Sequence, residues 1–235
     1  MYQTVRYLNY PIDVRRMSRK NRPTSTFKEF FVKVRTEARR EAILEVASQV
    51  FLELGFERAS MSEIVKRIGG SKSTIYGYFP SKEALFLAVS HAAGERHMAS
   101  SISELESYAG QGLRETLTGF AQQLLVFLGS REAIAAHRMV LGATADSDIG
   151  QMFYESGPKR GQQAVAELLQ QAMDHREVRV MDPWLAAQYF GAIVNAEFQH
   201  RWFLPDAPAI SQLQAREAAG RAIDVFARAF FLDKS

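Results

Sequence analysis

The stretch from Ser60 to Lys82 reads SMSEIVKRIGGSKSTIYGYFPSK and predicts two short helices joined by a tight turn. Ser60 and Glu63 have the S-x-x-E spacing of a capping box, which marks the start of a helix. Gly69-Gly70 then ends this helix, because glycine adopts the backbone angles of a turn without a Cβ clash. Ser71 can cap a second helix directly after the turn. The apolar residues of the first helix fall at i, i+3, i+4 and i+7, on one face: Met61, Ile64, Val65 and Ile68.

The second helix has an apolar side and a polar side. Ile75 and Phe79 are four residues apart and are predicted to face inward, and Pro80 ends the helix. The positions on or beside the outward face hold Lys72, Ser73, Thr74, Tyr76 and Tyr78. A helix that presents hydroxyls, phenols and a lysine after a turn of about three or four residues is typical of a helix-turn-helix that enters a DNA major groove.

With its flanks, this stretch resembles the DNA-binding domain of the tetracycline-repressor (TetR) family over about residues 39–89. Several positions and two turn signals must coincide, so the motif is specific. Gly70 departs from the family, which more often has a small apolar residue at this point of the turn. The resemblance is carried by ILEVASQVFLELGF (Ile43–Phe56), Ser60, Ile64, Gly69 and the T-x-Y-x-Y-F-x-S-K run from Thr74 to Lys82.

The chemistry of each motif residue, with the orientation that the resemblance implies, predicts a role at DNA. Ser60 and Ser62, at the start of the first motif helix, can bind a phosphate through hydroxyls and backbone amides. Tyr78 and Lys82 are predicted to contact the DNA backbone. For Tyr76 and Tyr78 the alternative is that they only pack the small domain, as buried tyrosines commonly do. The candidates for contacts with base edges are Lys72, Ser73, Thr74 and Tyr76.

Charge is distributed unevenly along the 235 residues, whose net charge is +3. Residues 1–35 contain nine Lys/Arg and two Asp/Glu, residues 36–85 contain seven of each, and residues 86–235 contain thirteen Lys/Arg and seventeen Asp/Glu. The net charge therefore runs from +7 through zero to −4. This asymmetry is expected if only the N-terminal end approaches phosphates.

Composition excludes several classes of protein. The absence of cysteine excludes disulfides, thiolate catalysis and cysteine-ligated metal. No uninterrupted apolar run approaches the roughly 18 residues of a membrane span, and the N-terminus lacks the apolar core of a secretory signal. We therefore expect a cytoplasmic protein without membrane contact.

Residues 1–35 are predicted to form a flexible basic extension, because they show no helical or strand period. One interpretation is an arm that adds phosphate contacts or enters a minor groove. The other is a solvated tail, the commoner role of a run of charge, or a start codon assigned too early, since Met17 could begin a shorter chain. The basic cluster in this extension consists of Arg15, Arg16, Arg19, Lys20 and Arg22.

The rest of the sequence predicts an all-α fold. A helix over about residues 36–54, stopped by Gly55, completes a three-helix DNA-binding domain over residues 36–84. A long helix from Glu83 then leads, as the resemblance implies, into a larger helical domain for ligand binding and dimerisation over residues 85–235. Further helices are predicted over residues 113–128, 131–145, 149–175 with an interruption at 157–158, 184–203 and 211–232, and no segment shows the alternation of a strand.

The last two predicted helices are the candidates for a homodimer interface. Their many alanines and glycines permit close approach of helices. The TetR family dimerises through a four-helix bundle from this region of two subunits, and a twofold DNA reader needs such a dimer. The alternative is that these faces close the core of the monomer. The predicted interface residues are Ala218, Ala222, Val225, Phe226, Ala229 and Phe230.

A small-molecule effector is expected in the C-terminal domain. The segments His137–Asp146, Phe153–Gly161 and Asp182–Phe203 resemble a C-terminal domain type from one branch of the TetR family, which names no effector. Each aromatic or methionine here is by itself more often plain core than a ligand contact. The candidates to line an apolar pocket with a few polar contacts are His137, Met139, Met152, Phe153, Trp184, Asn195, Phe198, Gln199 and Trp202.

A rival class is a helical-bundle metal enzyme. Glu197 and His200 form one Glu-x-x-His, which is half of the motif of a di-iron carboxylate bundle. The sequence has no second copy. Apart from His91 and Glu95 at i and i+4, the histidines show no metal-ligand spacing. The sequence therefore predicts no enzyme, with no catalytic residue, metal site or cofactor.

The expected function is that of a homodimeric, sequence-specific DNA-binding transcriptional regulator that a small apolar ligand releases from a near-palindromic operator. Repression rather than activation rests on the resemblance alone. The alternative is a ligand-independent or architectural DNA-binding regulator with the same motif and dimer helices. Ligand-dependent release from DNA would separate the two.

Overall fold

The computed structural model describes residues 25–110, 112–142, 148–204 and 207–232, with side chains from Thr36 onward. These residues form ten α-helices and a 3₁₀ helix, and the isolated bridge between Val178 and Phe231 does not extend into a strand. The chain divides into two compact units, with the boundary after Ala42, inside the first helix. The prediction of an all-α fold is confirmed.

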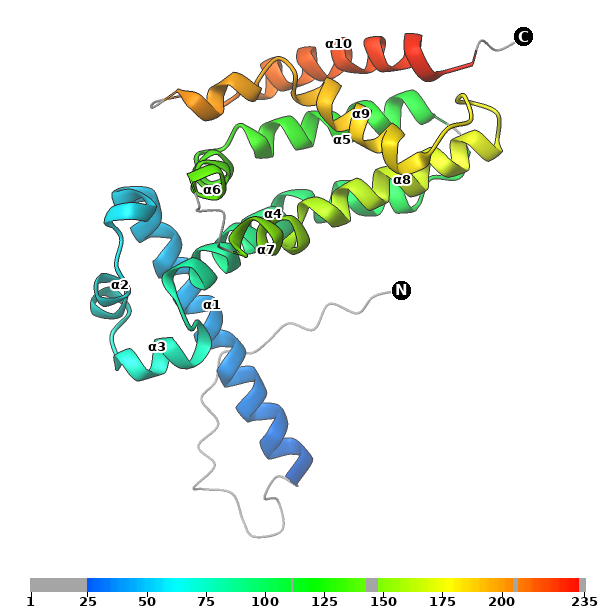
Figure 1. Cartoon of the computed structure of the whole chain (residues 1–235). Coiled ribbons are helices and arrows are strands. Elements are labelled where there is room, and N and C mark those ends of the chain that lie inside the picture. Colours follow the sequence, from blue (N-terminus) through cyan, green and yellow to red (C-terminus); the bar gives the residue numbers. More distant parts are fainter. Residues whose placement is uncertain (1–24, 111, 143–147, 205–206, 233–235) are drawn as a thin grey trace. The chain divides into compact units, whose positions relative to one another are not determined.

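The helices of the predicted motif are α1 (Ser25–Arg58), α2 (Met61–Ile68) and α3 (Lys72–Tyr78) (Figure 1). The hydroxyls of Ser60 and Ser71 cap α2 and α3, because they accept hydrogen bonds from the third amide of each helix at 3.2 and 3.1 Å. Each such cap is worth about 1 kcal/mol of stability. Gly55 has a non-helical backbone (φ 75°, ψ 164°) and kinks α1 just before its end.

The turn between α2 and α3 requires both of its glycines. Gly69 and Gly70 have φ values of 71° and 107°, in the region that side chains with a Cβ avoid. This geometry accounts for the second glycine, at which the sequence departs from the family pattern.

Only half of the predicted capping box forms. Ser60 accepts from the amide of Glu63, but the Glu63 carboxylate accepts from Arg67 Nε at 2.9 Å. Arg67 Nη1 also donates to Glu53 at 2.6 Å. The expected reciprocal contact of Glu63 with the Ser60 backbone is thus replaced by ion pairs that tie α2 to α1.

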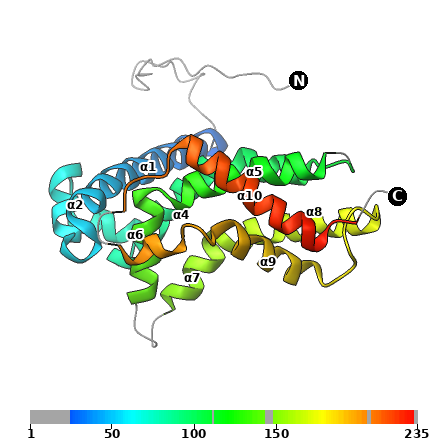
Figure 2. The same ribbon diagram turned by 90° about the horizontal axis from the view of Figure 1, so that it is seen from above.

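The long helix α4 (Lys82–Glu106) starts at Ser81, whose hydroxyl accepts from the amide of Ala84 at 3.1 Å. In space, α10 packs along α5 and α9, while α4 packs on α5 and α8 (Figures 1 and 2). The elements after α4 are α5 (Leu113–Leu128), α6 (Arg131–Gly142), α7 (Ile149–Ser156), α8 (Pro158–Asp174), α9 (Pro183–Asn195), the 3₁₀ helix η3 (Gln199–Phe203) and α10 (Gln212–Phe230).

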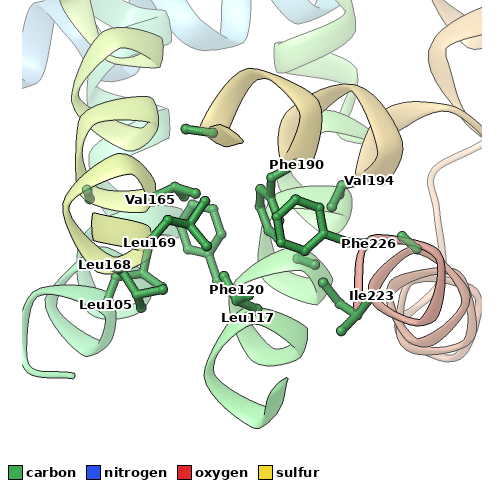
Figure 3. Packing of buried hydrophobic residues seen from close by; sticks show 14 of the residues in the cluster. Leu105, Leu117, Phe120, Val165, Leu168, Leu169, Phe190, Val194, Ile223 and Phe226 are labelled. Carbon is green, nitrogen blue, oxygen red and sulfur yellow. The ribbon is translucent and has the colours of Figure 1, made fainter. Parts of the chain in front are cut away.

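Two clusters of buried side chains fill the described part of the chain. We call the cluster of α1–α3, the start of α4 and Ala136 of α6 the small core, and it includes Ile43, Ile64, Ile75 and Leu85. The other, the large core, lies among α4, α5, α8, α9 and α10. In Figure 3, Phe120 and Phe190 lie between Leu169 of α8 and Phe226 of α10. Burial of each such side chain contributes roughly 1.5–3 kcal/mol.

Two segments differ from their predicted form. Residues 25–35, predicted to lack regular structure, belong to α1, and the sequence contains neither proline nor glycine from residue 24 to residue 54. The interruption predicted at 157–158 is present as a full break, because the Gly157 backbone leaves the helical region and Pro158 starts α8. The helix predicted over 184–203 ends at Asn195, after which backbone bonds span three residues and form η3.

Two further predictions concern the N-terminal extension and membrane insertion. The basic cluster of Arg15–Arg22 and the alternative start Met17 lie outside the described residues. None of the described helices is long and apolar enough to cross a membrane.

Candidate functional site

The outer side of α3 presents polar side chains beside a buried anchor. Ile75 is 1% exposed and fixes the helix to the small core, whereas Tyr76, the next residue, is 47% exposed. Thr74 Oγ1 lies 2.9 Å from the Ser71 hydroxyl, which holds it near the start of the helix. The structure thus places the four predicted base-contacting residues on the exposed part of one short helix: Lys72, Ser73, Thr74 and Tyr76.

The start of α2 presents two exposed hydroxyls, those of Ser60 and Ser62. The Ser60 oxygen accepts from the Glu63 amide, so its own O–H is still available as a donor. Amides at a helix N-terminus attract anions. This end of α2 therefore has the chemistry predicted for a phosphate contact.

Tyr78 and Lys82 have contacts within the protein. Tyr78 is half-buried and packs against the small core, with its ring centroid 6.5 Å from that of Phe79. Lys82 Nζ donates to the carbonyls of Phe56 and Glu57 at 2.9 and 3.4 Å and lies 4.2 Å from the Phe56 ring centroid. Two of the three ammonium donors are therefore directed at the last turn of α1, whose carbonyls attract cations. Sequence reasoning missed this role, since the contact joins residues about 25 positions apart.

A cavity of about 430 Å³ lies among α4–α9 and η3. Its walls are mostly apolar, with Met98 from α4, Phe120 and Phe127 from α5, and Phe190 from α9. This volume falls within the range of about 300–1,000 Å³ of pockets that bind small molecules.

His137 is the best-defined polar group of the cavity wall. Its Nδ1 lies 2.8 Å from the carbonyl oxygen of Ala133, one turn earlier in α6. The ring stacks on Trp202 at 4.4 Å between centroids and meets the edge of Phe153 at 5.4 Å. Burial lowers the pKa of His137 from its usual value, although the Ala133 carbonyl opposes this shift.

Four of the nine predicted ligand-binding residues line this cavity: His137, Phe153, Asn195 and Trp202. The other five do not. Met139 packs on the small core, Trp184 and Phe198 pack on the large core, and Met152 and Gln199 are exposed. Sequence reasoning missed the walls from α4, α5 and α8, because their apolar residues have the spacing of ordinary core residues.

The predicted interface residues on α10 fall into two groups. Ala218, Ala222 and Phe226 are buried within the chain, in the large core, so the alternative interpretation, closure of the monomer core, describes these three. Val225 is 55% exposed and Ala229 is exposed. Phe230 is half-buried and stacks on Tyr189 of α9 at 5.8 Å.

Glu197 and His200, on which the metal-enzyme hypothesis was based, have other surroundings. Glu197 accepts from Arg221 Nε and Nη2 at 2.9 and 2.7 Å, and this contact lowers the pKa of the Glu197 carboxyl. His200 is exposed on η3. Within the described ranges, no three or more His, Cys, Asp or Glu side chains come together in a way that could hold a metal ion.

Comparison with protein families agrees with both parts of this architecture. Residues 43–89 match the family described as bacterial regulatory proteins, tetR family, and residues 115–230 match the C-terminal domain of AefR-like transcriptional repressors. The two matches together cover most of the chain. The chain belongs to the TetR family.

Solved structures extend the TetR likeness to the whole described fold. A TetR-family regulator from Mesorhizobium loti superposes with a TM-score of 0.69 at 23% identity and covers 84% of this chain and 99% of its own. The flavonoid-responsive regulator FrrA superposes with a TM-score of 0.61 at 28% identity, over 84% of this chain and 100% of its own.

Curated TetR-like relatives match shorter stretches of the chain. The transcriptional activator FasR of Mycolicibacterium smegmatis is 40% identical over 80 residues, which is 34% of this chain and 33% of FasR. The chain thus spans about a third of the length of that relative.

Proposed function

We propose that this TetR-family protein is a homodimeric transcriptional regulator that binds a near-palindromic operator and is released from it by a small molecule. The observation that carries the proposal is the exposed polar side of α3, anchored by the buried Ile75 and preceded by a two-glycine turn. A short helix held in this way can enter a major groove and present its side chains to base edges.

Each proposed DNA contact has a distinct task. Lys72, Ser73, Thr74 and Tyr76 contact base edges, and Ser60, Ser62 and Tyr78 contact phosphates. Lys82 is proposed mainly as a positioning residue, because its ammonium holds the end of α1 against the start of α4. The domain division at residues 84/85 is part of the same proposal, and the small core extends past it into α4 with Leu85, Phe86 and Val89.

The cavity among α4–α9 is the proposed effector site. Regulation is a two-state equilibrium in which the effector binds better to the conformation with the wrong separation of recognition helices. The free energy of operator binding is then weakened by the difference between the effector's binding free energies for the two conformations. FrrA is described as flavonoid-responsive, and a FadR of Bacillus subtilis, at 18% identity, was solved with stearoyl-CoA. These relatives support a small-molecule effector without naming its class here.

Dimerisation is proposed through the exposed side of α9 and α10. The apolar residues available there are Leu185, Tyr189, Leu213 and Val225. The predicted residues Ala229 and Phe230 border this surface, while Ala218, Ala222 and Phe226 support it from the core. To read a near-palindromic operator, an isologous dimer must hold its two α3 helices about one DNA turn apart.

Repression is the proposed outcome of operator binding. The family matched by residues 115–230 is described as a repressor family. FasR, matched over 80 residues, is an activator. Because the helix-turn-helix only selects the site, the position of the operator relative to the promoter decides between the two.

Selection of binding sites from random duplexes, at low and high salt, tests the proposal. We expect an inverted repeat bound by a dimer, with an affinity that falls as salt rises. The triple change of Lys72, Ser73 and Thr74 to alanine is expected to abolish enrichment, while Lys66→Ala on α2 keeps it. Enrichment that is equal for the wild type and the triple variant would contradict the assignment of α3.

A further inference from the structure

The polar side of the cavity contains a hydrogen-bond acceptor that the protein leaves open. The Ala133 carbonyl can only accept, so His137 Nδ1 must carry the hydrogen that joins them at 2.8 Å. A neutral imidazole then has a bare Nε2, which is an acceptor. The buried position of His137 keeps the ring neutral near pH 7, because burial lowers its pKa.

The Nε2 atom of His137 is unpaired in the part of the chain that the structure describes and is not fully buried. It has no hydrogen-bond partner within the described ranges, and the fully buried unpaired side-chain nitrogens found there belong to Arg201 alone. His137 lines the cavity, and its neighbours Trp202 and Phe153 make ring contacts with it. The free side of Nε2 is therefore a place for a ligand donor.

The charges of the cavity wall oppose an anionic ligand. Arg160 Nη1 donates to Glu95 at 3.1 and 3.4 Å, and its Nη2 lies 3.9 Å from Glu106. Glu132, also in the wall, is half-buried and has no partner among the described side chains. The wall thus has one cation, which is already neutralised, and a second carboxylate, so a carboxylate or phosphate ligand would meet net negative charge.

The remaining walls favour an aromatic ring system. Phe120, Phe127, Phe190 and Trp202 come from three separate elements around the space. Aromatic side chains bind flat rings by offset-stacked and edge-to-face contacts. A ligand with a flat apolar body and a single donor would use both kinds of surface.

We propose that the cavity binds an uncharged aromatic compound whose phenolic hydroxyl donates to His137 Nε2. This assignment rests on the proposed function only in taking the cavity as the effector site. It adds the chemical class of the effector and the atom that recognises it.

Four probes with one ring system separate the possible classes: naphthol, its methyl ether, naphthoate and naphthylmethylammonium, each substituted at the same ring position. Binding to the full chain, without DNA, is measured by calorimetry at neutral pH. We expect naphthol to bind about tenfold more tightly than the ether, because the ether cannot donate a hydrogen bond. Naphthoate is expected to bind more weakly than the ether. A tighter naphthoate or ammonium probe, or no binding by any probe, would overturn the proposal.

His137→Phe keeps an aromatic ring against Trp202 and removes the acceptor. In this variant we expect naphthol and its ether to bind equally, with the ether affinity unchanged. His97→Phe is the matched control, because His97 Nδ1 also bonds a carbonyl one turn earlier, that of Ala93, and its ring lies 5.7 Å from Phe127, but the side chain does not line the cavity. In His97→Phe, naphthol should still bind about tenfold more tightly than its ether. Loss of this preference in both variants would contradict the role of His137.

The outcome is independent of operator binding. If His137→Phe does not fold, the order of the four probes on the wild-type chain still decides the ligand class. An operator that stays bound when naphthol occupies the cavity would contradict ligand-induced release but not the assigned class. Failure of all probes on a chain that selects an inverted repeat would contradict the class and leave DNA binding established.

Discussion

The ammonium of Lys82 lies against the end of α1, and this position gives a testable role. Lys82→Met keeps the stem over the Phe56 ring but removes the donors to the two carbonyls. Since the group is half-exposed, we expect the free energy of unfolding to fall by about 1 kcal/mol. Operator affinity should fall equally for all sequences, with an unchanged dependence on salt.

Denaturant unfolding and salt-dependent binding check this prediction together. Lys66→Met, an exposed lysine on α2, is the control and should change neither quantity. If Lys82→Met instead lowered the slope of log affinity against log salt by about one, Lys82 would be a direct phosphate contact.

The lowered pKa of His137 predicts that the folded chain loses stability at acidic pH. Its pKa is lowered in the folded chain, mainly by burial, so the unfolded chain binds its proton at a higher pH than the folded chain does. The contribution of the neutral ring is complete above about pH 6.5, the usual pKa of histidine, and is lost as pH falls through the lower folded value. The melting temperature of the wild type should therefore fall more between pH 7 and pH 5 than that of His137→Phe. Parallel curves for the two proteins would contradict this.

Substitutions on the exposed side of α3 should change the sequence preference of the protein more than its overall affinity for DNA. Thr74→Ala and Lys72→Ala each remove one exposed polar group from the groove-facing side. Each change should reduce discrimination at one or two base positions by about 1–3 kcal/mol. Repeating the binding-site selection with each variant measures this. A loss spread evenly over every sequence would mean that these side chains contact only the DNA backbone.

Local signals explain why α2, α3 and the start of α4 were predictable and the cavity was not. Ser60, Gly69-Gly70 and Ser71 cap or end helices through contacts with residues a few positions away. Their effect on α2 and α3 can therefore be predicted from the local sequence. The cavity depends on Phe120, Phe190 and His137 meeting across distant elements, and an aromatic beside a void has the same spacing as one in a packed core. The break at Gly157-Pro158 has a local signal and was predicted, whereas no proline or glycine directly follows Asn195 to mark the end of α9.

For the whole molecule, the proposed dimer gives the clearest prediction. Val225→Glu puts a carboxylate into the exposed apolar side of α10 and should raise the dimer dissociation constant at least tenfold, because an unpaired charge would be buried at the interface. Val180→Glu is the matched control, since Val180 is also an exposed valine (87%) but lies outside α9 and α10. Sedimentation velocity over a concentration series measures both. A Val225→Glu protein that stays dimeric would place the interface elsewhere.

The helix α6 and Phe153 of α7 belong to two environments. Ala136 lies in the small core, with Ala135, Met139 and Phe153 packed against it, and Ala136, His137 and Phe153 also line the cavity. A chimera that joins residues 43–89 to the C-terminal part of a relative must therefore match these side chains as well as the chain junction. Recombination among relatives can exchange such parts. In those proteins we expect the residues at positions 135, 136, 139 and 153 to match the DNA-binding domain that they pack against. Because two of these positions also line the cavity, such changes would alter effector preference as well.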